Sequence, residues 1–213
     1  MPRQNRVTPT GQIIATEARG TFMGNRGILH NAQQKIVKPF AYKTWIICLL
    51  NFKGRQRALM QPGKYTELFF LDEATALAAG HRPCFECRRA AAIAFRDAWL
   101  AGNPQLGFGE SVSAPQMDAV LHAERLTEAH RMKDRKKRTY TVVLPTLPNG
   151  TFILWQERPY LVWQDALLPW TPAEYEAPVS QPRDGVVAVL TPPSTVAALA
   201  HGYVPQLHEL VNT

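Results

Sequence analysis

Only three of the 213 residues are cysteine, and this small, odd number argues against a framework of disulfide bonds. No uninterrupted apolar run is long enough to cross a membrane, and no leading apolar stretch follows the basic residues 1–6. Several enzyme motifs are also missing: the phosphate-binding P-loop, the glycine fingerprint of dinucleotide-binding folds, Gly-x-Ser-x-Gly and His-Glu-x-x-His. These absences predict a soluble cytoplasmic protein that works without those motifs.

Acidic residues are also scarce, with 17 Asp and Glu against 24 Lys and Arg, and the net charge is +7. Excess positive charge favours an anionic partner, and nucleic acid is the commonest one for a basic cytosolic protein. The densest basic run covers residues 131–138, where a solvated linker is the alternative interpretation. The residues that we expect to contact nucleic acid, DNA more than RNA, are Arg55, Arg57, Arg88, Arg89, Arg125, Arg131, Lys133, Arg135, Lys136, Lys137 and Arg138.

Two of the three cysteines form a C-x-x-C motif, Cys84 and Cys87. Asp72 is suited to the N-cap of a short helix before them, and Gly80 is suited to the left-handed residue that ends it. Pro83 fits the first turn of a second helix, so both thiols would share one face of its N-terminus. The spacing predicts half of a zinc site, and the alternatives are a redox dithiol or two small buried residues.

The same stretch carries a longer pattern, made of Phe69-Phe70, Glu73-Ala74, Ala76 to Cys84, and Cys87-Arg88. This pattern resembles the second half of the N-terminal zinc domain of the bacterial adaptive-response methyltransferase Ada. In that family a strand, a short helix, a Gly-aromatic-Arg-Pro turn and a C-x-x-C follow one another in this order. The resemblance covers about a tenth of the chain. It implies a four-thiolate zinc ion and contact with the DNA backbone.

The chain departs from the Ada pattern in its first pair of ligands. The family supplies them from an upstream C-x-x-x-C, whereas Cys48 stands alone here. Cys48 lies in the apolar run 43–52, which predicts a buried central strand, so it is either a core residue or a third thiolate. His30 or His81 are further residues that would close a structural site. No methyl-transfer domain is visible, so the repair chemistry of the family does not carry over.

We expect His122 to be the best third ligand, on a helix that starts near Ser113. Asp118 and Arg125 share its helical face, which suits a carboxylate that orients the imidazole and an arginine for an anionic substrate. Glu124 lies two residues further along and points away from that face.

A hydrolase of the deaminase type is an alternative function. His122-Ala123-Glu124 and Pro83-Cys84-Phe85-Glu86-Cys87 contain both halves of the zinc-deaminase signature, in reversed order. In that chemistry a non-ligand carboxylate moves protons for zinc-bound water, which makes Glu124 or Asp118 candidate catalytic residues. A third interpretation is a protein-interaction regulator with a structural zinc.

The predicted fold is α+β in two parts. Residues 1–138 would form an Ada-like strand-helix-CxxC-helix zinc unit that faces nucleic acid, and residues 139–213 a small β-rich meander or partial barrel with a terminal helix. Asn149-Gly150 predicts a type I′ hairpin between strands at 139–144 and 151–155. Gly24 to Gly27 predicts a tight turn, with an anion-binding nest beside Arg26 as the alternative.

Overall fold

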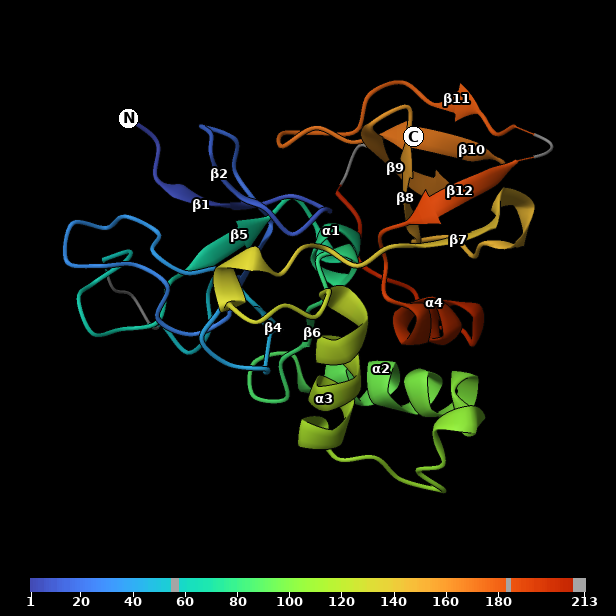
Figure 1. Cartoon of the computed structure of the whole chain (residues 1–213), viewed down its shortest axis with the longest axis horizontal. Coiled ribbons are helices and arrows are strands. Elements are labelled where there is room, and N and C mark those ends of the chain that lie inside the picture. Colours follow the sequence, from blue (N-terminus) through green and yellow to red (C-terminus); the bar gives the residue numbers. More distant parts are fainter. Residues whose placement is uncertain (55–57, 183–184, 209–213) are drawn as a thin grey trace.

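The computed structural model describes residues 1–54, 58–182 and 185–208, which form two six-stranded sheets and four α-helices (Figure 1). The strands of the first sheet, in spatial order, are β2 (Ile13–Ala15), β1 (Gln4–Val7), β5 (Leu68–Phe70), β3 (Phe22–Asn25), β4 (Ile46–Cys48) and β6 (Arg82–Pro83). Those of the second are β11 (Val179–Ser180), β10 (Ala166–Pro169), β9 (Arg158–Trp163), β8 (Phe152–Trp155), β12 (Val186–Val189) and β7 (Tyr140–Val143). The predicted mixed α+β class is confirmed.

The helices begin and end where local chemistry favours it. They are α1 (Glu73–Ala78), α2 (Arg89–Gly102), α3 (Ala114–Arg125) and α4 (Pro193–Ala200). The Asp72 carboxylate caps α1 by accepting a hydrogen bond from the Thr75 amide at 2.8 Å, and Gly80 follows with a φ of +92°. Ser113 opens α3 with a capping box. No helix in the described parts of the chain has both the length and the apolar character that a membrane span needs.

Helix α1 lies between the two sheets, at the centre of Figure 1, and all its residues are buried. Ala76 and Leu77 pack into the core of the first sheet, whereas Ala74 and Ala78 pack into a core with aromatic residues of the second. Helix α4 returns from the second sheet and packs against α2. The predicted boundary near Arg138 therefore falls between the two sheets in sequence, while the C-terminal helix joins the core of the N-terminal part.

The hairpin predicted at Asn149-Gly150 is wrong, because β12 lies between β7 and β8 and pairs with both. The observed hairpin joins β8 to β9 through Gln156 and Glu157, whose φ values are +48° and +62°. A type I′ turn requires a positive φ at both turn residues. Gln156 and Glu157 adopt this conformation although neither is the usual Asn or Gly. Because this turn lacks the Asn-Gly signal, the sequence did not predict the pairing of β8 with β9.

Candidate metal centre

The pairing of β4 with β6 brings two distant cysteines together. These strands are parallel, with Ile46 opposite Arg82 and Ile47 opposite Pro83, so one further step places Cys48 beside Cys84. The Cys84 amide donates to the Ile47 carbonyl at 2.9 Å and continues this ladder. The turn that follows brings Cys87 back, and the three sulfur atoms all lie within 4.8 Å of one another.

The local structure around the motif corrects one prediction. Arg82 and Pro83 form a strand rather than the start of a helix, since the Arg82 amide donates to the Trp45 carbonyl at 3.1 Å. Helix α2 begins only at Arg89. The positions of Cys84 and Cys87 are therefore set by a strand end and a turn, and not by the first turn of a helix.

The three thiols are electrostatically linked. A hydrogen bond from Cys48 lowers the pKa of the Cys84 thiol to about 5, and backbone N–H groups of Cys87 and Glu86 act in the same direction. The hydrogen bond to Cys84 raises the pKa of Cys48, as does burial, and burial also raises that of Cys87. A divalent cation would replace the shared protons and favour the thiolate form of all three.

The cysteines line one cavity of about 660 Å³, whose other walls combine apolar side chains with Asn25, Tyr65, Glu67 and Glu86. Its hydrophobic lining includes Met23, Ile46, Leu50, Phe52 and Phe69. Among the described residues, no fourth Cys, His, Asp or Glu belongs to the group of three sulfurs. Three soft donors around one point match the ligand preference of a zinc ion.

His122 lies elsewhere, which corrects the expectation that it is the third ligand. Its ring nitrogens face Arg125 at 2.9 Å and Arg135 at 3.3 Å, and its ring packs edge-on against Phe40. Burial, with the charges of Arg125 and Arg135, lowers the pKa of His122 to about 4 and keeps it neutral. Asp118 does not orient it, because this carboxylate binds the Arg82 guanidinium with two hydrogen bonds of 2.8 Å.

Glu124 also turns away from the cysteines. Its carboxylate accepts hydrogen bonds from the Ser194 hydroxyl at 2.6 Å and the Ser194 amide at 3.2 Å, at the start of α4. The described structure therefore does not assemble the reversed deaminase signature.

The two other candidate histidines are engaged in different contacts. His81 Nε2 accepts from Arg26, while its Nδ1 lies 3.2 Å from the Ala76 carbonyl. His30 bonds to Thr66 and to the Gln61 carbonyl. Neither histidine belongs to the sulfur group in the described structure.

The expected nucleic-acid contacts divide into buried and exposed residues. Arg88 is buried and paired with Glu73 at 2.7 and 2.8 Å, and Arg125 is buried against the carbonyls of Gly80 and Lys43. These two arginines are therefore not presented to a nucleic acid at the surface. Arg135 and Lys137 are half-buried, and the exposed members are Arg89, Arg131, Lys133, Lys136 and Arg138. Arg55 and Arg57 lie outside the described residues.

No protein-family model, curated protein or solved structure matches this chain. The role of the three cysteines is therefore inferred from their chemistry and surroundings.

Proposed function

We propose that the protein binds zinc through Cys48, Cys84 and Cys87. The observation that carries this proposal is the convergence of three sulfur atoms from two separate segments within 4.8 Å. Zinc sites are commonly four-coordinate, so three protein donors leave one position for water or another ligand. The bound ion would stabilise the junction between β4 and the turn that precedes α2.

The resemblance to Ada supports this assignment and also limits it. In an upstream C-x-x-x-C that begins at Cys48, the second cysteine would fall at Phe52. We therefore propose an Ada-like unit that has lost one thiolate, with the vacant coordination position filled by a non-protein ligand. A thiolate-rich zinc acidifies bound water less than a His-rich one, because its ligands already neutralise the charge of the ion.

Metal analysis of three variants tests the ligand set. The wild type should contain one zinc per chain, with three sulfur donors and one light-atom donor in X-ray absorption. Cys48→Ser should lose most of the metal, whereas His122→Ala and Glu124→Gln should keep it. A metal-free wild type, or equal metal loss in Cys48→Ser and His122→Ala, would refute the proposed centre.

We also propose that the anionic partner is a nucleic acid, with DNA favoured over RNA. The support is the net charge of +7 and the exposure of Lys133, Lys136 and Arg138, close together in the sequence. Lysines and arginines that neutralise phosphates release counterions, so each contact steepens the dependence of affinity on salt.

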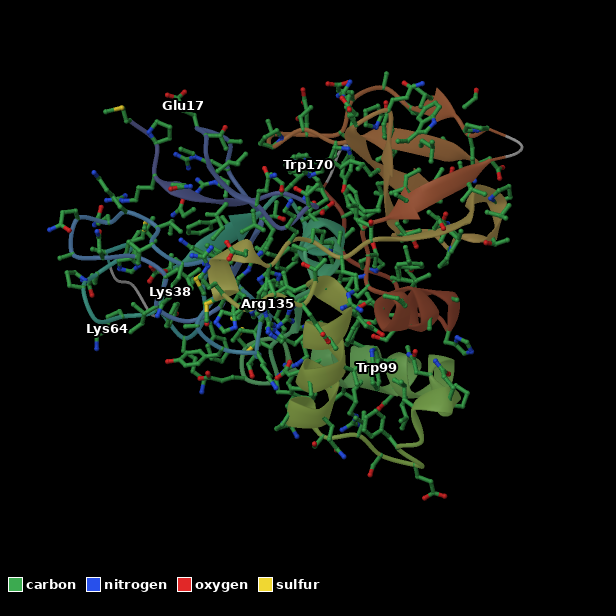
Figure 2. The ribbon with its side chains drawn as sticks, viewed as in Figure 1. Glu17, Lys38, Lys64, Trp99, Arg135 and Trp170 are labelled. Carbon is green, nitrogen blue, oxygen red and sulfur yellow. The ribbon has the colours of Figure 1, made fainter. Side chains whose placement is uncertain are left out.

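Fluorescence anisotropy with labelled duplex DNA, single-stranded DNA and RNA at several salt concentrations tests this part. Substituting Lys133, Lys136 and Arg138 by Gln should weaken binding and reduce the salt slope by about 2 to 3. The matched control substitutes Lys35, Lys53 and Lys64, which are exposed on other loops (Figure 2 labels Lys64). Equal losses of affinity in both triple variants would mean that the positive charge attracts nucleic acid without a localised site. No affinity for any of the nucleic acids at low salt would favour the alternative of a protein-interaction regulator.

A further inference from the structure

Three cations of the N-terminal part line one cavity, and two of them contact the same aromatic ring. The guanidinium carbons of Arg26 and Arg125 lie 3.9 and 3.8 Å from the centroid of the Trp45 indole, and both side chains are 1% exposed. Lys137 reaches the same region and donates a hydrogen bond to the Ala78 carbonyl. Contact with the ring face offsets part of the cost of burying the two guanidinium groups, but it supplies no counter-charge.

Among the described residues, no carboxylate lines the cavity beside this cluster. Arg26, Arg125 and Lys137 line a cavity of about 680 Å³, and none of the cavity-lining residues is Asp or Glu. The charge of Asp118 acts on Arg125, but this carboxylate is bound by Arg82 through two hydrogen bonds. The cluster therefore joins two buried arginines and the half-buried Lys137, without an anion of its own in the part of the chain that the structure describes.

The hydrogen bonds within the cluster are also incomplete. Arg26 donates to the Gly11 carbonyl and to His81, and Arg125 donates to the Gly80 and Lys43 carbonyls. Arg26 Nη2 and Arg125 Nε are nevertheless buried without a hydrogen-bond partner among the residues that the structure describes. An unsatisfied donor on a buried cation carries a large desolvation cost, so its retention points to a ligand that accepts from it.

Titration is consistent with this geometry. Burial, followed by the charges of Arg125 and Arg26, lowers the pKa of Lys137 to about 7. Burial lowers the pKa of Arg26 to about 9. Each cation is held at an energetic cost that a bound anion would remove.

We propose that this cavity is a binding site for a phosphate group, carried either by a small molecule or by the end of a nucleic-acid strand. Guanidinium groups match phosphate oxygens with paired N–H donors, and a lysine adds a point charge. The volume is in the range of small-molecule sites. Lys38, Arg135 and Lys136 add positive charge to the same cavity, and Figure 2 labels Lys38 and Arg135.

This site stands apart from the metal centre. The two cavities share no lining residue. Phosphate binding should therefore persist in Cys48→Ser if that variant remains folded, and this separates failure of one proposal from failure of the other.

Calorimetric titration of the full chain with inorganic phosphate, pyrophosphate and a nucleoside monophosphate tests the site, with chloride at equal ionic strength as the reference. We expect saturable binding to at least one phosphate compound. Lys137→Met should weaken it at least tenfold, whereas Lys64→Met, on an exposed loop, should bind as the wild type does. Arg135→Gln is the second variant, because its half-buried side chain is less important for folding than Arg26.

The source of the phosphate is distinguished with one oligonucleotide prepared with a 5′-phosphate, a 3′-phosphate or neither. A preference of at least tenfold for a phosphorylated end supports strand-end recognition, and tight binding of the mononucleotide without such a preference supports a small molecule. Absence of saturable binding to every phosphate compound would overturn the proposal. Wild-type affinity in both Lys137→Met and Arg135→Gln would also overturn it.

Discussion

The two faces of the first sheet carry opposite chemistry. Side chains alternate along a strand, so Ile46 and Cys48 face the cavity of the three thiols, while Trp45 contacts the cation cluster. On β3, Met23 and Asn25 line the thiol cavity, and Arg26 follows in the other. One face therefore gathers thiols, which become negative on losing protons, and the other gathers positive groups that no described carboxylate of that cavity balances.

Charges elsewhere in the interior show what this difference means. Arg88 and Glu73 form a buried pair, as do Arg82 and Asp118, and each pair balances itself. In both of these pairs the chain itself supplies the opposite charge to a buried arginine. The two unbalanced groups on the sheet are thus the places where a bound cation and a bound anion would complete the structure.

Removal of the metal should destabilise the protein strongly. At a free zinc concentration about 1,000-fold above the Kd, binding adds about 4 kcal/mol to the free energy of unfolding. For a chain of this length, this gain corresponds to a rise in Tm of about 8 to 16 °C. Calorimetry with and without a chelator measures this shift. Cys48→Ser should melt near the chelated wild type and respond little to chelator, whereas identical wild-type melts in both conditions would contradict a stabilising metal.

The same substitution at two buried arginines, one paired with a carboxylate and one not, tests the contrast between balanced and unbalanced charges. Arg88→Met leaves the Glu73 carboxylate buried without its cation and should cost about 3 to 5 kcal/mol in the free energy of unfolding. Arg26→Met strands no carboxylate and removes a repulsive charge, so its cost should stay within about 1 to 2 kcal/mol, mainly from lost hydrogen bonds. Urea unfolding of both variants measures the difference.

Arg96→Met is the control, because Arg96 pairs with Asp97 at the exposed surface and should change stability by less than about 0.5 kcal/mol. Equal losses in Arg88→Met and Arg26→Met would mean that the cation cluster is balanced within the fold, and the contrast between the two faces would be lost.

Local chemistry made several elements predictable from the sequence. The Asp72 cap, the left-handed Gly80 and the Ser113 start of α3 depend on residues close together in the chain, and the structure contains all three. The Cys84 and Cys87 pair is local in the same sense. Its spacing is sufficient to suggest a metal without knowledge of the fold.

Non-local pairing explains what the sequence did not reveal. Cys48 meets Cys84 only because β6 adds to β4 in parallel, and a two-residue strand has no detectable periodicity of its own. The helix start predicted at Pro83 agrees with local sequence preferences, but the hydrogen bonds between β6 and β4 make this segment a strand instead. The cation cluster is hidden for the same reason, because Arg26, Trp45 and Lys137 lie far apart in sequence and no motif links them.

Acidification should give the smallest effect and act on the cationic face. Burial and neighbouring cations lower the pKa of His81 and of His122, the latter to about 4, below the unfolded value near 6.5. Between these values the unfolded chain binds more protons, so stability should fall as the pH drops from 6.5 towards 5, by about 1 kcal/mol for His122. Urea unfolding at several pH values measures the loss.

His122→Gln should flatten this pH dependence in part, and His201→Gln, at the exposed end of α4, should leave it unchanged. Saturating phosphate sharpens the test, because an anion beside Arg26 and Arg125 would reduce the positive potential that keeps both imidazoles neutral. The decrease in the free energy of unfolding on acidification should then be smaller in phosphate than in chloride at equal ionic strength. An equal loss in both salts would mean that no anion reaches the cluster, and the positive face of the sheet would have to be stable without a counter-ion.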